Sequence, residues 1–424
     1  MSCPRSVSLT DLLNGLQDLQ NREGRKATLL AINPMSRFIV RSTLEAAQEY
    51  QFPVMLIATR NQVETRELGG GYILGWDQEQ FVAEIRDFCH QIGFRGALFI
   101  CRDHGGPWLR DHEYQENLPE KEAMERAKAS FLADIRAGFN VLHVDCTVDP
   151  HFKGYVPLKI VTKRTVEIIE YIEKRRKKEG LGKIGYEAGA EKTAGGLTDF
   201  RAFEEFLKSL IQELDERNLP RPDFIVGQTG TLIKMQKNVG DFNSDTAQRL
   251  AAITRKYGVG FKEHNADFLD DEILKLHPDL GITAANTGPE FSTVEIKAYL
   301  KLGDREKEAV KQGRLRSPSN FLSVLRKRAL ESERWRKWLE KNQTHLTRDD
   351  VAKDPQILDD VTVVSGRYVM DEELVRREKA KLFQNLENLK IVAGPERAII
   401  ESIKKSTLRW IEAFNLKNLN LRIN

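Results

Sequence analysis

Cysteine and long apolar runs are scarce in this chain of 424 residues. Its four cysteines include no CxxC pair and are too few for a disulfide scaffold, so we expect reduced thiols and a cytoplasmic protein. No apolar run is long enough to span a bilayer, and the N-terminus lacks the apolar stretch of a signal peptide. These absences exclude a membrane-spanning protein and a small secreted one held together by disulfides.

Neither sign of charge dominates, because 66 Lys and Arg residues face 63 Asp and Glu residues, for a net charge of +3. We therefore expect neither nucleic acid nor a membrane surface as a partner, and any anionic ligand must be bound by a local site. The P-loop, GxGxxG, HExxH and GxSxG patterns are also missing, so nothing favours a nucleotide-binding protein, a zincin or a serine hydrolase.

What the chain does contain is a regular alternation. Eight short apolar runs, each closing on a polar or charged residue, are separated by segments of helical character; they cover residues 28–33, 53–60, 96–104, 140–145, 183–189, 223–228, 258–264 and 281–286. This alternation predicts a (β/α)8 TIM barrel, whose active site lies at the C-terminal ends of its strands. An amphipathic helix over residues 9–21 precedes the first strand, and we expect it to close the bottom of the barrel.

The barrel is expected to occupy residues 1–303, and residues 304–424 to form a C-terminal helical subdomain packed against it. The periodic strand signal stops near Leu302, and beyond it Trp335, Trp338 and the stretch 383–389 supply apolar stripes typical of helices. The segment Gly366–Tyr368 is a candidate for the loop by which the subdomain reaches the site. The sequence is compatible with a homo-oligomer but does not specify one.

Polar residues mark the predicted strand ends, and core packing does not explain them. They are Asn33, Thr59, Asp103, His104, Asp145, Glu187, Gln228, His264 and Asn286. Because these ends meet at one mouth of a TIM barrel, we predict that the protein is an enzyme.

His104 and His264 end the third and seventh predicted strands and are two of only eight histidines. Neutral imidazole is a common ligand of a catalytic divalent ion, so we expect these two residues and one carboxylate to hold Zn, Mn, Co or Ni. Glu187 is the first candidate for that carboxylate and Asp267 the second. Two hydrogen-bonded structural histidines are the alternative. His143 shares a face with Asp145 inside the fourth strand and is expected in the core or in support of the site.

Two further carboxylates and a helix start complete the candidates. Glu187 and Glu191 flank the turn after the fifth strand and suit a general acid and base, although a solvated loop is nearly as good an explanation for Glu191. Thr287 and Gly288 precede a helix that starts with proline, and its free backbone N–H groups suit a phosphate, assisted by Arg60, Lys153 or Lys262. The glycine-rich loop at 69–71 follows the second strand and suits a mobile lid.

Seven motifs, in order along the chain, resemble the GatZ/KbaZ-like family of tagatose-bisphosphate aldolase subunits. They are ATRNQV (58–63), GGY (70–72), DHGGPW (103–108), HVD (143–145), GAE with GG (189–191 and 195–196), EHNAD (263–267) and NTGPEF (286–291). The resemblance spans the whole barrel and continues through WRKWL (335–339) and GRYV (366–369).

That family is similar to class II aldolases, which are metal-dependent TIM barrels. The resemblance implies that Asp103 transfers a proton, that His104 and His264 bind the metal, and that Asn286 contacts an enediolate. At the sixth strand, where those aldolases place a third histidine ligand, this chain has Gln228. Residues 265–267 likewise replace the phosphate-binding loop of those enzymes.

Within the family, the DHGGPW and ANTGPEF motifs most resemble members that interconvert fructose 6-phosphate and tagatose 6-phosphate. The resemblance therefore implies a metal-dependent 4-epimerase of a phosphorylated ketohexose that breaks and remakes the C3–C4 bond. A tagatose-1,6-bisphosphate aldolase, or its non-catalytic stabilising subunit, is the alternative. The expected catalytic residues are Asp103, Glu187, Glu191 and Asn286. The expected substrate-binding residues are Asn33, Asn61, Asp145, Gln228, Asp267, Thr287 and Gly288.

Overall fold

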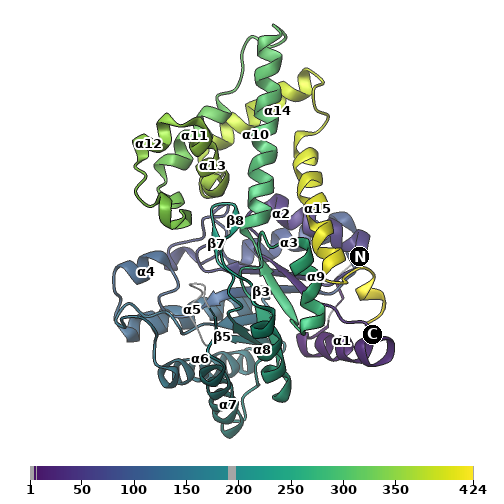
Figure 1. Ribbon diagram of the computed structural model, residues 1–424, viewed down its shortest axis with the longest axis vertical. Helices are drawn as coiled ribbons and strands as arrows, with labels where there is room; N and C mark the ends of the chain where they lie inside the picture. The colour runs from purple at the N-terminus through teal and green to yellow at the C-terminus, as the bar shows by residue number, and fades with distance from the viewer. Residues whose placement is uncertain (1–3, 6, 190–196, 424) are drawn as a thin grey trace.

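Eight parallel strands close into a barrel in the computed structural model, which describes residues 4–5, 7–189 and 197–423 (Figure 1). The strands are β1 (Leu29–Ile32), β2 (Val54–Thr59), β3 (Leu98–Gly105), β4 (Val141–Val144), β5 (Gly185–Gly189), β6 (Phe224–Gly227), β9 (Gly260–Glu263) and β10 (Ala284–Thr287). Around the barrel they follow the order β1-β10-β9-β6-β5-β4-β3-β2, and β1 pairs with both β10 and β2 to close it. The TIM barrel predicted from the sequence is confirmed.

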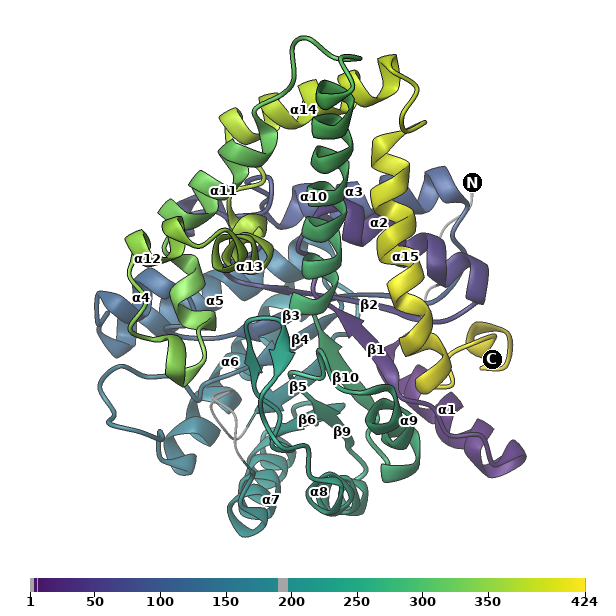
Figure 2. The same cartoon turned by 45° about the horizontal axis from the view of Figure 1, so that its top comes forward.

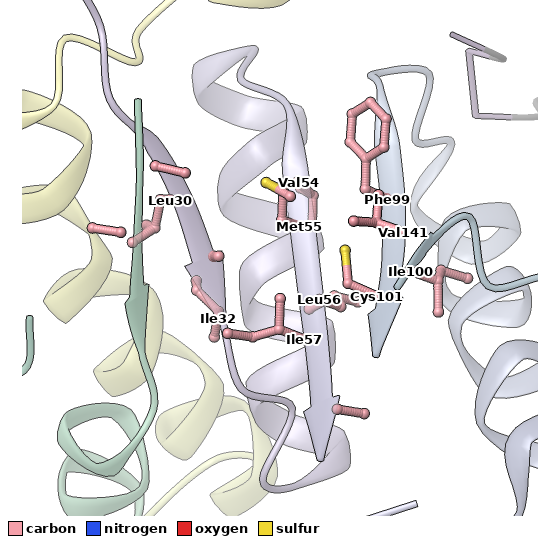
Figure 3. Close-up of a cluster of buried hydrophobic side chains, with 14 of the residues drawn as sticks. Leu30, Ile32, Val54, Met55, Leu56, Ile57, Phe99, Ile100, Cys101 and Val141 are labelled. Carbon is pink, nitrogen blue, oxygen red and sulfur yellow. The ribbon is translucent and has the colours of Figure 1, made fainter. Parts of the chain in front are cut away.

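The strands coincide with apolar segments whose side chains are buried on both faces of the sheet, toward the barrel interior and toward the helices. Figure 3 shows Leu30 and Ile32 of β1, Met55 and Ile57 of β2, and Phe99 and Cys101 of β3 among the buried side chains of this region. Val54 through Ala58 are all at most 1% exposed, which is the continuous apolar burial expected of a parallel strand covered by helices.

Helices surround the barrel where the sequence predicted segments of helical character. They are α2 (Arg37–Tyr50), α3 (Gln78–Ile92), α5 (Glu120–Ala137), α6 (Leu158–Lys178), α7 (Phe200–Glu216), α8 (Ser244–Lys256), α9 (Asp271–Leu280) and α10 (Pro289–Lys311). Side chains of Ser36, Asp77 and Asn243 accept backbone N–H groups at the starts of α2, α3 and α8, which stabilises those ends. α9 continues through Pro278, which lies inside the helix near its C-terminal end.

The helix before the barrel, α1 (Leu9–Glu23), lies at the N-terminal ends of the strands. Thr10 donates a hydrogen bond of 2.8 Å to Asp223, the residue directly before β6. Leu9 packs beside Gly185, the first residue of β5. The structure thus places α1 where the sequence predicted it, across the bottom of the barrel.

Three short elements were not predicted. The turn η1 (Arg66–Leu68) follows β2, the helix α4 (Asp111–Gln115) follows β3, and a hairpin of β7 (Ile233–Lys234) and β8 (Lys237–Asn238) follows β6. All three extend from C-terminal ends of barrel strands.

The rest of the chain is helical, as expected. Its elements are α11 (Phe321–Glu331), η2 (Arg334–Trp338), η3 (Lys341–Gln343), α12 (Arg348–Lys353), α13 (Pro355–Ser365), η4 (Gly366–Tyr368), α14 (Glu373–Asn388), α15 (Pro395–Ala413) and η5 (Leu419–Leu421). Figure 2 shows α11 to α14 gathered beyond one end of the barrel, while the yellow α15 runs back beside α2. α10 continues across residue 303, so the division into two domains there stays a prediction.

The C-terminal helices cover the mouth at which the strands end. The backbone N–H of Met235, in the hairpin after β6, donates to the carbonyl of Trp338 at 2.8 Å. Leu74, in the loop after β2, donates its backbone N–H to Asp371 at 2.9 Å. Among the helices described, none is long and apolar enough to cross a membrane.

Candidate active site

Asp103 lies at the centre of the barrel mouth, near the end of β3, and is 5% exposed. Asn33, directly after β1, donates to one carboxylate oxygen at 3.1 Å, and Asn286 of β10 donates to the other at 3.2 Å. Burial alone would raise the pKa of Asp103, but His104, His143 and His264 together lower it well below its usual range. The carboxylate therefore stays ionised and held from both sides.

His104 follows in the same strand with a backbone φ of +44°, a left-handed conformation that is uncommon for a residue other than glycine. Its Nδ1 atom lies 2.7 Å from Oδ2 of Asp145, and the other oxygen of Asp145 accepts two bonds from Thr147. Gly106 lies so close to the Asp145 carbonyl that any side chain there would collide with it. The loop after β3 thus requires glycine to bring His104 against Asp145.

His264 faces His104 from the end of β9. Its Nδ1 atom is 3.2 Å from Nε2 of His104, and its Nε2 atom is 3.0 Å from Oε1 of Glu187. The other oxygen of Glu187 binds the Nζ atom of Lys262 at 2.5 Å. Burial would raise the pKa of Glu187, but Lys262 and His143 lower it well below its usual range, so this carboxylate is ionised and can only accept hydrogen bonds.

The two rings are therefore oriented with their inner nitrogens toward each other. Asp145 and Glu187 accept the outer N–H groups, because ionised carboxylates have no proton to donate. Burial would lower the pKa of His104, but Asp103 and Asp145 raise it to about 9. Burial and the charge on His104 lower the pKa of His264 to about 4. The pair thus accommodates one positive charge between the rings.

The donor set of this region suits a divalent metal ion. One ligand atom from each of Asp103, His104, His143 and His264 lies within 4.8 Å of the others. A separation of 3.2 Å between two imidazole nitrogens is compatible with one ion bound at about 2.0–2.1 Å by each. Outer nitrogens bound to carboxylates are the usual support of metal-bound histidines. The residues present therefore fit a metal ion of the kind that imidazole binds.

This set differs from the one predicted. His104 and His264 belong to it as expected, but the third histidine is His143 of β4, which the sequence placed only in the core or in a supporting role. Glu187, the first predicted carboxylate, is not in this set, and its oxygens bind Lys262 and His264. The signal for His143 was present in the sequence: it shares a face of the strand with Asp145, whose side chain points into the mouth.

Four buried polar atoms near the cluster have no hydrogen-bond partner among the residues described. They are both side-chain amide atoms of Gln228, Oδ1 of Asn286 and Nε2 of His143. Buried polar groups are normally paired, so these atoms offer donors and acceptors to the hydroxyl groups of a bound ligand. Gln228 lies directly after β6, where the sequence predicted a substrate contact.

The predicted phosphate seat at Thr287 and Gly288 is filled by the protein itself. Oδ1 of Asp267 accepts the Thr287 hydroxyl at 2.9 Å, the Gly288 N–H at 2.9 Å and the Glu290 N–H at 2.7 Å. Burial and the nearby Glu290 raise the pKa of Asp267 to about 6. A carboxylate already satisfies the donors at the start of α10, so Asp267 caps this helix and is not positioned as a metal ligand.

The cations expected to assist a phosphate there are engaged in ion pairs or exposed. Arg60 forms buried ion pairs with Glu64 and Glu113, and Lys262 pairs with Glu187. Lys153 lies exposed in the loop after β4.

Two other predicted residues remain. Asn61 donates a hydrogen bond to Asp111 at 3.3 Å and so joins the loops after β2 and β3. Glu191 falls outside the described residues, so its predicted role is untested. In the glycine loop after β2, a side chain at Gly71 would collide with the backbone of Gln62, whereas one at Gly70 would meet nothing within 4 Å.

Comparison with known proteins gives a family match over most of the chain. The model of the family described as D-tagatose-1,6-bisphosphate aldolase subunit GatZ/KbaZ-like matches residues 16–398.

Several solved structures share the fold at low sequence identity. A probable tagatose 6 phosphate kinase from Sinorhizobium meliloti 1021 is 18% identical, with a TM-score of 0.70 over 92% of this chain and 100% of the other. The fructuronate-tagaturonate epimerase UxaE from Cohnella laeviribosi is 12% identical, with a TM-score of 0.55 over 98% and 84%. The YdjI aldolase from Escherichia coli K12 is 13% identical, with a TM-score of 0.52 over 97% and 98%.

Proposed function

The chain belongs to the D-tagatose-1,6-bisphosphate aldolase subunit GatZ/KbaZ-like family, and from this membership we propose that it is a metal-dependent 4-epimerase interconverting D-fructose 6-phosphate and D-tagatose 6-phosphate. The proposal rests on one arrangement above all: an ionised Asp103 beside a set of facing imidazoles that suits a divalent ion. The names of two structural neighbours, an epimerase and an aldolase, agree with this chemistry.

Inversion at C4 of a ketose needs more than proton exchange on carbon. C4 is β to the C2 carbonyl, so the C4–H bond is not acidic and enolisation does not reach it. Cleavage of C3–C4 solves the problem. A base takes the proton of the C4 hydroxyl, C4 becomes an aldehyde, and the electron pair of the broken bond forms an enediolate over C2 and C3. Rotation of the aldehyde, renewed addition to its other face and return of the proton give the C4 epimer.

Asp103 is the proposed base. Asn33 and Asn286 each donate to one of its oxygens, which fixes the carboxylate while leaving lone pairs for a substrate hydroxyl. A divalent ion held by His104, His143 and His264 would supply the positive charge that stabilises oxygen at C2 and C3 when the bond breaks. Oδ1 of Asn286 and the free amide of Gln228 would then orient the sugar hydroxyls.

Closure of the site separates an epimerase from an aldolase, because both fragments must stay bound until the bond re-forms. The C-terminal helices contact the loops after β2 and β6 and so cover the mouth. Cleavage with release of trioses, as in a tagatose-1,6-bisphosphate aldolase, is the second candidate function, since the same Asp103 and imidazoles would serve it and YdjI shares the fold.

The test is direct incubation of the purified protein with fructose 6-phosphate and Zn, Mn, Co or Ni in turn. We expect tagatose 6-phosphate to accumulate toward equilibrium, and a chelator to stop it. Accumulation of free triose phosphates at the rate of substrate loss would favour the aldolase. A metal-loaded protein that binds the substrate yet leaves it unchanged would overturn both enzymes in favour of a stabilising subunit.

A further inference from the structure

Arg367 is a buried cation without a matching anion. Its side chain lies on η4 and the residue is only 6% exposed. Two of its nitrogens donate to hydroxyls, to Ser292 at 2.9 Å and to Tyr368 at 3.0 Å, and its Nε atom has no partner in the described part of the chain. No carboxylate oxygen of those residues lies within ion-pair distance of it. A guanidinium in this position is poised to receive an anionic ligand.

Two more cations face the same aromatic ring. The guanidinium carbons of Arg367 and Arg334 lie 4.7 and 5.0 Å from the centroid of Tyr368, and Nζ of Lys337 lies 5.3 Å from it. Arg334 pairs with Asp111, while no ion pair of Lys337 occurs within the described ranges. These three cations and Asp111 together carry a charge of about +2, which matches the charge of about −1.5 to −2 on a phosphate monoester at neutral pH.

The pKa of the Tyr368 hydroxyl is consistent with the same excess of positive charge. Burial would raise the pKa of the Tyr368 hydroxyl, but Arg367 and Lys337 lower it to about 8.

The cluster adjoins the barrel mouth. Tyr368 meets the edge of Tyr72 with their centroids 5.0 Å apart, and the backbone N–H of Tyr72 donates to Asn61, just after β2. Arg367 reaches Ser292 in the first turn of α10, which begins three residues after Asn286. The cations thus lie over the ends of β2 and β10, on the side of the site that the C-terminal helices cover.

We propose that Arg334, Lys337 and Arg367 around Tyr368 form the seat of the substrate's phosphate group, a phosphate cradle supplied by the C-terminal region. Its identification with a sugar phosphate rests on the proposed function, while the anion site rests on the contacts above. The cradle also explains why the N–H groups at the start of α10 can be capped by Asp267: the phosphate is bound by the three cations and not by those N–H groups.

The test measures the strength of binding and not the rate of turnover. Calorimetry on the whole protein gives two dissociation constants, one for fructose and one for fructose 6-phosphate. The Kd of fructose divided by the Kd of fructose 6-phosphate isolates the contribution of the phosphate. Lys337→Gln changes an exposed side chain, and Arg367→Lys keeps the charge but removes the planar fork. We expect each to lower the ratio about tenfold, the cost of one charge-assisted hydrogen bond. Arg348→Gln removes an equal charge from an exposed position of the same region and should leave the ratio unchanged.

Each alternative has its own result. An unchanged ratio in both cradle variants, together with a fall in Lys153→Gln, would move the phosphate to the loop after β4 and overturn the proposal. Inorganic phosphate that binds the cradle without competing with fructose 6-phosphate would identify an effector site, which also overturns it. If the wild-type protein does not epimerise fructose 6-phosphate but the cradle variants lower the ratio, the proposed epimerase activity is wrong and the phosphate cradle stands. If the wild-type protein epimerises normally and the cradle variants leave the ratio unchanged, only the cradle is wrong.

Discussion

The Nε2 atom of His104 and the Nδ1 atom of His264 face each other at 3.2 Å, although each ring gives its other nitrogen to an ionised carboxylate. Two neutral rings oriented in this way would present lone pair to lone pair, so a proton or a metal ion must lie between them. The charges around the site favour a cation: Asp103, Asp145 and Glu187 are all held in their ionised forms.

The first prediction concerns the ligands of that cation. Purified protein should hold about one divalent ion per chain by elemental analysis, and both His264→Ala and His143→Ala should lose most of it. A ligand at 100 times its Kd stabilises a fold by about 2.7 kcal/mol, so chelation should lower the Tm of the wild-type protein but hardly that of the variants. His151→Ala, an exposed histidine in the loop after β4, is the control. Full metal content in His143→Ala would exclude that residue from the ligand set.

The second prediction concerns proton transfer by Asp103. Asp103→Asn should lower kcat by roughly a hundredfold or more, because an amide cannot accept the C4 hydroxyl proton. The Tm and metal content should be compared with wild type, since the new amide meets the donors of Asn33 and Asn286. Near-normal turnover in a folded, metal-loaded variant would assign the base to Glu187 or Glu191 instead.

The barrel and its polar ring could be predicted from the sequence because both depend on local periodicity. Strand ends at Asp103, His264 and Asn286 meet in any closed eight-stranded barrel. The eight apolar runs were therefore sufficient to predict that these side chains lie close together. His143 was accessible to the same reasoning, since it alternates with Asp145 along β4. The ion pair of Glu187 with Lys262, 75 residues later, could not be predicted, because a carboxylate at a strand end does not indicate its partner. The role of Glu187 as a metal ligand stays a prediction.

Contacts between distant segments were beyond this reasoning. Asp267 folds onto the start of α10, 21 residues further on at Gly288, and so replaces the ligand that the free N–H groups suggested. Arg367 reaches Ser292 from 75 residues away. Which charges are compensated depends on such contacts, and a sequence without its fold does not reveal them.

The third prediction uses Glu295, which is buried in α10 and accepts the Ser36 hydroxyl at 2.6 Å. Burial raises its pKa to about 7, although Ser36 and Lys379 lower it. The protonated form is thus favoured in the fold, and the unfolded chain releases its proton near the ordinary value of 4.5. The free energy of unfolding should therefore fall as pH rises from about 4.5 to about 7, by roughly 1.4 kcal/mol per pH unit from this group, and then level off.

Thermal unfolding at pH 5 and pH 8 checks this dependence. Glu295→Gln should reduce the difference in Tm between the two conditions, chiefly by raising the Tm at pH 8. Glu308→Gln, an exposed position on the same helix, should behave as wild type. An unchanged difference in Glu295→Gln would show that other groups cause the pH dependence.

The last prediction concerns the C3–C4 bond and the cover over the mouth. If this bond breaks, a mixture of substrate labelled with ¹³C in C1–C3 and substrate labelled in C4–C6 should yield some doubly labelled and unlabelled sugar, because fragments that escape recombine with new partners.

Asp371 accepts the backbone N–H of Leu74 and so ties the C-terminal helices to the loop after β2. Asp371→Ala should loosen that contact and raise both crossover and released triose, whereas Arg348→Gln should change neither. Mass spectrometry of the product measures the crossover. Solvent deuterium on C4 of the epimer would instead require cleavage of the C4–H bond, and that result would replace the retro-aldol route while leaving epimerisation itself in place.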